Sequence, residues 1–318
     1  MKRLIFNIFL VLLMLILTFL IILPLKYTKI YSKKENFSNN NLITQNKYCC
    51  FYAYYEKGQL YKDNFKYFLE NGLLDNIDYY IIINGTSTIE IPIQNNIKVM
   101  HRENKGFDFG AYSYAIKNIT KEYNYYVFLN ATVKGPYLED TSKNWLDTFL
   151  SLFNDNVKLV GSSICYAKTD QFNLKSITNK DSIYFVQTPF FIIKNDFLQY
   201  LNSKNFFNED ELNNIKDLSY VIINKEVRLS SLCYEFGGNI NCYLSKYRNL
   251  DYTTLNYDIN NSSFNGDPYF INTYFCDTIK ENDVIFFKNK RFLYDTITLK
   301  DVLYKHKLDI IDKICNNI

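Results

Sequence analysis

Short apolar runs alternate with amphipathic segments through much of the chain after residue 46. Apolar runs of about four to eight residues are typical of buried strands, whereas apolar residues three and four apart indicate helices. The first four runs, at residues 49–55, 78–84, 97–102 and 125–129, predict strands, and residues 61–74 and 110–119 predict helices. This alternation favours an α/β fold with a mostly parallel, Rossmann-like sheet flanked by helices.

The second half of the chain continues the pattern with longer interruptions. Residues 217–236 form the longest amphipathic stretch and predict a helix that stops at Gly237 and Gly238. A polar, asparagine-rich segment at residues 251–267 predicts a loop. Further helices are expected at residues 144–153 and 299–318, and further strands at 157–166, 182–194, 239–244 and 283–288.

The amino-terminal segment carries a different signal. Residues 4–25 contain no charge and match the roughly 20 apolar residues that span a bilayer as a helix. A cleaved signal peptide is the alternative, but its apolar region is usually shorter and ends in small residues, so a retained anchor is favoured. Lysines on both sides of the span leave its orientation open. We therefore expect a short tail at 1–3, an anchor at 4–25, a polar stem at 26–46 and one domain at 47–318.

Composition narrows the classes of partner and site. The chain is 47% hydrophobic and has a net charge of +3, without a basic block interleaved with aromatics, so nucleic acid is not a favoured partner. Its seven cysteines show no C-x-x-C spacing and no paired histidine, which disfavours structural zinc. Cys233 and Cys242 could form a bridge in an oxidising compartment, but buried free thiols are the favoured interpretation.

Polar residues gather where the predicted strands end. Ligands of open α/β sheets bind at the carboxyl ends of the strands, so a binding site is predicted there. Glycines let backbone amides approach a ligand closely, and a short carboxylate can accept hydrogen bonds from ligand hydroxyls. The candidate substrate-binding residues at these strand ends are Asn84, His101, Arg102, Asn104, Gly106, Asp108, Gly110, Asn130, Thr132, Lys134 and Gly135. A turn at Asp108 that only caps a helix is the alternative.

The words HRENKGFDFGAY and FLNATVKGP, at residues 101–112 and 128–136, resemble GT-A-fold glycosyltransferases of the family-2 type. They are most similar to the rhamnan-synthesis-protein-F-like branch, in patches over residues 47–291. The resemblance implies a nucleotide-sugar donor, a glycan or glycoprotein acceptor, and a type II membrane protein whose catalytic domain faces a secretory lumen. Asn104, Gly106 and Asp108 would then lie at the donor, with Asp108 counted among the catalytic residues.

The chain departs from that family at its metal-binding motif. Where the family has D-x-D, this sequence has Asn130, Ala131 and Thr132. Divalent Mg²⁺ or Mn²⁺ prefers carboxylate ligands, so no metal residue is assigned and a metal site, if present, is weakened. Lys134 is the nearest positive charge that could replace the metal at the diphosphate.

Two further segments match the same relatives. KEVRLSSLCYEFGGNI, at residues 225–240, implies that Glu226 is the catalytic base, with Glu235 as a competitor. NGDPYF…FFKNKR, at 265–291, implies that Lys288 and Arg291 reach the diphosphate or an acidic acceptor. A catalytically inactive, glycan-binding or scaffolding protein of the same fold is the alternative function, and a hydrolase is disfavoured because no G-x-S-x-G or H-E-x-x-H motif occurs.

Overall fold

The computed structural model describes residues 47–140, 142–170, 174–289, 310–311 and 313–316. Contacts divide the chain into residues 1–45 and 46–318, and every described residue belongs to the second unit. The expected tail, anchor and stem lie outside the described residues. Among the described helices, none has the length and apolar character needed to cross a bilayer.

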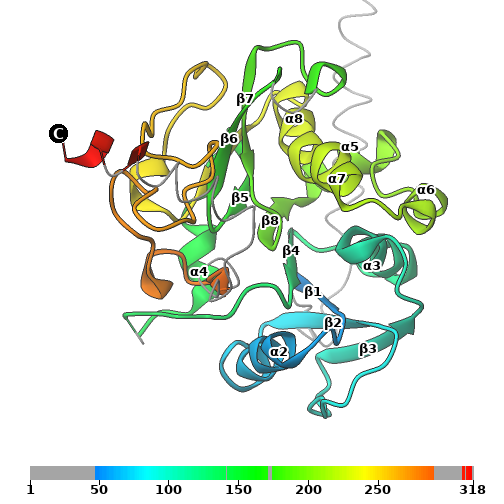
Figure 1. Ribbon diagram of the computed structural model, residues 1–318. Helices are drawn as coiled ribbons and strands as arrows, with labels where there is room; N and C mark the ends of the chain where they lie inside the picture. Colours follow the sequence, from blue (N-terminus) through cyan, green and yellow to red (C-terminus); the bar gives the residue numbers. More distant parts are fainter. Residues whose placement is uncertain (1–46, 141, 171–173, 290–309, 312, 317–318) are drawn as a thin grey trace, which may run out of the picture. The chain divides into compact units, whose positions relative to one another are not determined.

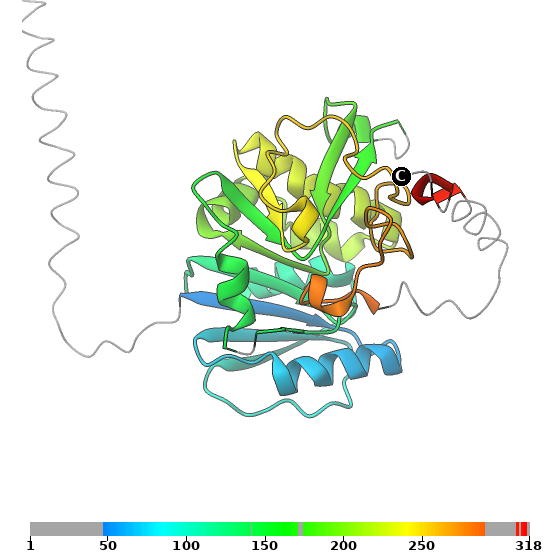
Figure 2. The same ribbon diagram turned by 90° about the vertical axis from the view of Figure 1, so that its left-hand side faces the viewer.

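A mixed seven-stranded sheet forms the centre of the described unit, with strand order β3-β2-β1-β4-β8-β5-β9. Six strands run in one direction and β8 runs against them. Figures 1 and 2 place the blue and cyan strands β1–β3 at one end of this sheet and the green strands β5 and β8 toward the other. The strands are β1 Tyr48–Tyr54, β2 Ile77–Asn84, β3 Ile97–Arg102, β4 Tyr125–Asn130, β5 Val157–Gly161, β8 Phe190–Lys194 and β9 Asn239–Cys242.

Helices cover both faces of the sheet because successive strand residues point to opposite sides. In β1, Phe51 packs into a core with α3, α5 and α8, whereas Tyr52 packs into a second core with α2 and α4. A separate hairpin pairs β6 Ile164–Lys168 with β7 Ser182–Val186. The helices are α2 Gln59–Asn71, α3 Phe107–Asn118, α4 Trp145–Leu150, α5 Asn195–Ser203, α6 Glu209–Asn214, α7 Leu218–Val221 and α8 Arg228–Glu235. Short 3₁₀ turns lie at η1 Leu174–Ser176, η3 Ser245–Tyr247 and η4 Glu281–Asp283.

The predicted α/β architecture, with a mostly parallel sheet flanked by helices, is confirmed. The first four strands and the helices at 61–74 and 110–119 occur close to their predicted positions. The run at 157–166 divides into β5 and β6, because the chain leaves the large sheet after Gly161. The helical stretch 217–236 is continuous through α7 and α8, but its middle, Ile222–Val227, is a π-helix, η2.

The strand predicted at 283–288 is wrong. These residues begin in the 3₁₀ turn η4. Of the six, which are all described, only Phe287 forms a β-bridge, to Lys134. The apolar character has another cause: Ile285 and Phe286 are buried in the same core as α2 and α4. Helices α5 and α6 were not predicted. Most of the closing helix expected at 299–318 lies outside the described residues.

The cysteines are mostly buried thiols. Cys49, Cys50, Cys165, Cys233 and Cys242 are free and buried, so the favoured interpretation is confirmed and the bridge between Cys233 and Cys242 is absent. Cys276 and Cys315 form a disulfide that the sequence did not indicate.

Candidate functional site

The candidate site lies at the carboxyl end of β4. Strands β2 and β3 follow β1 on one side of the sheet, and β4 pairs with β1 on the other, so the chain changes direction between β1 and β4. Such a topological switch point opens a crevice at the carboxyl ends of the strands. Asn130, the last residue of β4, pairs with Ala53 of β1 at this point. The local sequence therefore places an amide side chain at the position where α/β sheets bind ligands.

Asn130 and Asp108 form a direct pair. The Asn130 Nδ2 donates to Asp108 Oδ2 at 2.8 Å, although the residues come from β4 and from the first turn of α3. The Asn130 Oδ1 accepts hydrogen bonds from the Thr132 amide and hydroxyl, at 2.9 and 2.5 Å. These bonds fix which end of the amide faces the carboxylate. The structure thus brings together three residues that the strand-end pattern had singled out.

Partial burial makes Asp108 a weak acid. Burial is the main cause that raises the pKa of the Asp108 carboxyl to about 6. The nearby charge of Glu226 contributes to this rise, whereas the hydrogen bond from Asn130 opposes it. The Asp108 Oδ1 also accepts from the Phe109 amide at 3.0 Å. The buried Tyr112 hydroxyl faces the same group without a well-formed hydrogen bond among the described residues; burial, and then the charge of Asp108, raises its pKa. Carboxyls with such shifts are enriched at functional sites.

Glu226 reaches the same site from a distant segment. It lies in η2, and its Oε2 accepts from the Thr188 hydroxyl at 2.6 Å. Thr188 precedes Pro189, whose backbone carbonyl accepts a hydrogen bond from the backbone N–H of Asn130 at 3.1 Å. This chain of contacts explains why the Glu226 charge acts on Asp108 although 118 positions separate the two in the sequence.

The π-helical turn at Glu226 is held by its neighbour. The Lys225 ammonium is buried, donates to the Phe206 carbonyl at 2.9 Å and pairs with Glu211 of α6 at 3.0 Å. Single π-turns inside α-helices occur often at functional sites, because they redirect one side chain without ending the helix. Here the buried lysine anchors one face of the turn while Glu226, which is only half-buried, faces Thr188.

The raised pKa of Asp108 predicts a pH dependence of stability. Its pKa of about 6 lies above the ordinary 3.8, so between these pH values the folded protein keeps a proton that the unfolded chain loses. The free energy of unfolding should therefore fall as pH rises through this window, by up to about 3 kcal/mol for a shift of about two units. Urea unfolding of wild type and Asp108→Asn at pH 4 and pH 7 measures this: the variant should gain relative stability at pH 7. A stability difference that does not change with pH would contradict the assignment.

Arg102 and Asn84 hold the turn that precedes α3. One terminal nitrogen of Arg102 donates to Asn84 Oδ1 at 2.8 Å and to the Lys105 carbonyl at 2.9 Å. The other nitrogen donates to Asn213 Oδ1 of α6 at 2.7 Å. Burial lowers the pKa of this guanidinium. A Cβ at Gly110 would overlap the Lys105 carbonyl and lie 3.2 Å from the guanidinium nitrogens. The hydrogen bonds of Arg102 and Asn84 thus go to other protein groups, and in the structure these residues shape the loop that carries Asp108.

Gly106 permits the close approach of α3 and α6. Its φ of 68° is left-handed, and a Cβ would overlap the Leu212 carbonyl oxygen. We expect Gly106→Ala to lower the free energy of unfolding by at least about 2 kcal/mol, because the left-handed backbone alone costs about 1–2 kcal/mol. Gly58→Ala is the control, since Gly58 has φ 168° and nothing within 4 Å of an added Cβ. Equal melting temperatures for the two variants would contradict this role.

The remaining predicted site residues lie in different surroundings. The Lys134 ammonium lies 4.8 Å from the Tyr67 ring centre on α2, and its backbone pairs with Phe287. Gly135 packs against the Ile285 carbonyl, where a side chain would not fit. His101 and Asn104 are exposed, and Arg291 lies outside the described residues.

Lys288 is close to the candidate site. It lines a small cavity of about 10 Å³ together with Ser162, Ser163, Gln187 and Pro189, next to Thr188. The Ser162 hydroxyl there is buried without a partner among the described residues, and the Ser163 hydroxyl donates to Gln187 Oε1 at 2.6 Å. The cavity is about the size of one water, and Val133, Phe190, Tyr269 and Phe286 make the rest of its lining largely apolar. Sequence reasoning missed Thr188 and Gln187; the only available signal was the Pro189 that interrupts the strand pattern.

The described residues do not fit a divalent cation. Mg²⁺ is usually held by one or two carboxylates together with waters and substrate phosphates, and the described residues contain no group of three or more His, Cys, Asp or Glu side chains that could hold a metal. The Asn130 oxygen, which stands where the resembling family has a carboxylate, is already engaged by Thr132. We therefore derive no chemical step through a metal.

No family model and no curated protein matches the sequence. The solved structures that it resembles include a Pyrobaculum calidifontis mannosyltransferase in complex with GDP-mannose and Mn²⁺, at 13% identity and TM-score 0.31 over 57% of this chain and 53% of that one. They also include the Streptococcus pneumoniae glycosyltransferase GlyE, at 12% identity and TM-score 0.31 over 57% and 43% of the two chains. An Anaerococcus prevotii 4-diphosphocytidyl-2C-methyl-D-erythritol synthase has 11% identity and TM-score 0.34 over 68% and 94%. The chain thus spans about half of the mannosyltransferase, and at these scores the similarities carry no functional conclusion.

Proposed function

We propose that this protein is a glycosyltransferase that moves a sugar from a nucleotide-sugar donor to a hydroxyl of a glycan or glycoprotein. The observation that carries the proposal is the Asp108–Asn130 pair at the switch point, with the charge of Glu226 acting on the same carboxyl. Sugar hydroxyls donate well to carboxylates, and Asp108, which Asn130 holds in place, supplies a carboxylate at the edge where α/β sheets bind ligands.

In the proposed reaction the acceptor oxygen attacks the anomeric carbon, and the bond from that carbon to the diphosphate oxygen breaks. Glu226 takes the proton of the acceptor hydroxyl, and the nucleoside diphosphate leaves with the electron pair. The Thr188 hydroxyl fixes the orientation of the Glu226 carboxylate. Asp108 accepts a hydrogen bond from a donor hydroxyl, and Asn130 holds Asp108 in place. Lys288 lines the small cavity beside Thr188, and its ammonium would face the departing charge.

The finer assignments rest on the sequence. The sequence motifs at residues 101–112 and 128–136 support a member of the rhamnan-synthesis-protein-F-like branch that transfers a hexose or deoxyhexose. The uncharged segment 4–25 supports a single-pass membrane protein, and the resemblance supports the type II orientation. We include both in the proposal.

A second candidate is a catalytically inactive protein of this fold that binds glycans or serves as a scaffold. The observation that favours it is the loss of both acidic metal ligands at Asn130 and Thr132. Incubating the full-length chain with UDP-, GDP- and dTDP-sugars, and measuring release of the nucleoside diphosphate with and without glycan acceptors, separates the two functions. A transferase releases the diphosphate from at least one donor, whereas the absence of release from the whole panel would favour the inactive protein.

A further inference from the structure

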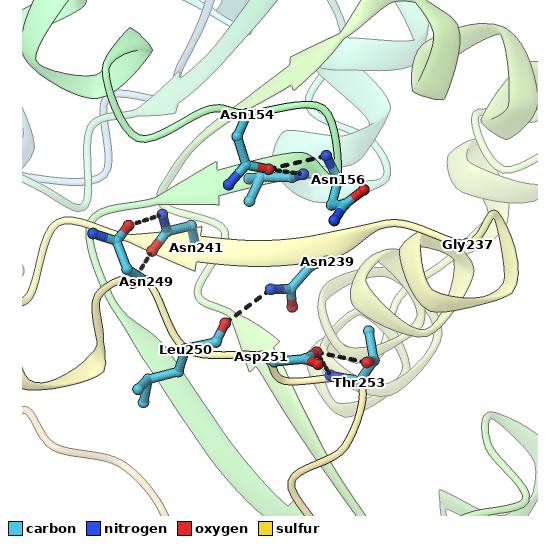
Figure 3. A pocket seen from close by; sticks show the side chains of 10 residues that line it. Asn154, Asn156, Gly237, Asn239, Asn241, Asn249, Leu250, Asp251 and Thr253 are labelled. Carbon is cyan, nitrogen blue, oxygen red and sulfur yellow. Dashed lines mark hydrogen bonds between the residues drawn. The ribbon is translucent and has the colours of Figure 1, made fainter.

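A cavity of ligand size lies away from the candidate site. Its volume is about 430 Å³, within the range of small-molecule pockets. Its walls come from the turn at 154–157, from β9 with the preceding Gly237, and from the loop at 249–253 (Figure 3). These are the amino ends of β5 and β9, and none of Asp108, Asn130 and Glu226 lines the cavity. Because a five-residue strand is roughly 16 Å long, a ligand here would lie well apart from one at the carboxyl ends.

Two asparagines of β9 hold the cavity open. The Asn241 amide donates to the Asn249 Oδ1 at 2.9 Å, and its oxygen accepts from the Asn249 backbone amide at 2.9 Å. The Asn239 amide donates to the Leu250 carbonyl at 2.8 Å. These bonds join the loop to the edge strand and keep Asn249 in a left-handed conformation, with φ 60°. Strained backbone of this kind persists where the surroundings fix it and is common at ligand sites.

Several polar groups on the walls keep unused hydrogen-bonding capacity among the described residues. The Asn154 Oδ1 accepts from two backbone amides at 2.9 Å, which leaves its NH₂ group free. The Asn249 NH₂ group is free for the same reason. The exposed amide of Asn156 makes no side-chain hydrogen bond within the described structure. One Asp251 oxygen binds the backbone and hydroxyl of Thr253, and the other is open.

The chemistry of these groups selects the ligand. The lining residues include no cation, and their single charge is the Asp251 carboxylate. The lysines beside them, Lys194 and Lys180, donate to the backbone carbonyls of Asn154 and Thr253. The lining itself therefore suits an uncharged ligand better than a phosphate or nucleotide. Val157 and Leu250 are the only larger apolar side chains of the lining, so an apolar ligand would leave the amides unpaired. Hydroxyl groups both donate and accept, and neighbouring hydroxyls match a set of planar amides with one carboxylate.

We propose that this cavity is a second saccharide-binding site, which holds an uncharged sugar unit of a glycan apart from the site of the proposed transfer. This inference does not depend on catalysis, because a scaffold with no transferase activity would bind the sugar equally well. In a transferase, such a site would retain a glycan acceptor between reactions and raise its local concentration.

Saturation-transfer NMR tests the site on the full-length chain, kept in a detergent without a sugar headgroup. The probes are the methyl glycosides of mannose, glucose, galactose, rhamnose and N-acetylglucosamine. We expect at least one to bind with a Kd in the millimolar range. Its affinity should fall at least about tenfold in the double variant Asn156→Ala/Asp251→Asn, because the charged acceptor is lost while the asparagine oxygen can still accept from Thr253.

Two controls make the outcome specific. Asn71→Ala removes an exposed asparagine at the end of α2 and should leave the affinity unchanged. Glu226→Gln alters the candidate catalytic site and should also leave it unchanged. The inference is overturned if no glycoside binds, if binding survives the double variant, or if Glu226→Gln abolishes it. Unfolding temperatures of all variants within a few degrees of wild type show that the losses are local. Nucleotide binding is measured separately, so the transferase proposal can fail while this one stands.

Discussion

Replacement of Glu226 by glutamine is expected to lower the rate of sugar transfer by about 10²–10⁴-fold, the usual contribution of a general base. Glutamine keeps the size of the side chain and can still accept from the Thr188 hydroxyl, whose bond to Glu226 is 2.6 Å long. It cannot take a proton from an acceptor hydroxyl. Donor affinity should change little, because the carboxylate acts on the acceptor. Initial rates and donor KM at saturating acceptor measure both quantities.

Glu235 provides the matched control. It lies in the same continuous helical stretch, is exposed, and pairs with Arg228 at 3.0 Å. Glu235→Gln should therefore leave the transfer rate within about twofold of wild type, because exposed ion pairs contribute little. If Glu235→Gln were the slow variant and Glu226→Gln the normal one, the base would be misassigned. Unchanged rates in both variants would remove this helix from the mechanism.

Replacement of Asp108 by asparagine is expected to weaken binding of the nucleotide-sugar donor by about 10–100-fold. A hydrogen bond to a charged group contributes about 1.5–3 kcal/mol, and the neutral amide forms a weaker one. The ionised carboxylate is the better acceptor, and the pKa of Asp108 is about 6. Wild-type donor affinity should therefore fall as pH drops below 6, whereas the affinity of the variant should not change there. Calorimetric titration between pH 5 and pH 8 measures this.

Asp147 is the control for this substitution because its setting is similar. It lies in the first turn of α4 and accepts from an asparagine, Asn144, at 2.7 Å, but it is at the surface. Asp147→Asn should leave donor affinity and its pH profile unchanged. Equal losses in the two variants would mean that the effect of Asp108 on binding is an indirect result of altered helix stability.

Some of the candidate site follows from sequence pattern alone. Asp108 follows one predicted strand and Asn130 ends the next strand along the chain, and parallel strands end at the same edge, so their placement at one edge was predictable. Strands β3 and β4 are separated by β2 and β1 in the sheet, so the direct contact depends on where α3 begins. Their 2.8 Å contact is consistent with that reasoning. Glu226 had no such local signal, because it comes from a helix far along the chain, and only the family resemblance indicated it. Thr188 carries no sequence signal at all, since its role arises from tertiary contact with Glu226.

Errors in the fold prediction have a common physical cause. The run at 283–288 looks like a strand because its apolar residues are consecutive, yet burial by side-chain packing against Phe190 and Trp145 gives the same composition. Gly106 and Gly110 look like a phosphate-binding turn, yet both also satisfy close packing against carbonyl oxygens. The pattern of apolar residues in a sequence indicates which residues are buried, whereas contacts with the rest of the fold determine whether they form a strand or another structure.

Calorimetry of the full-length chain with UDP, GDP and dTDP, with and without EDTA, tests the central claim most directly. If the strand ends around Asp108 and Asn130 cradle an activated sugar without acidic metal ligands, at least one nucleotide binds with a Kd of about 1 mM or tighter, EDTA leaves that affinity unchanged, and Asp108→Asn weakens it. Failure of all three nucleotides to bind, or loss of binding in EDTA, would contradict the account.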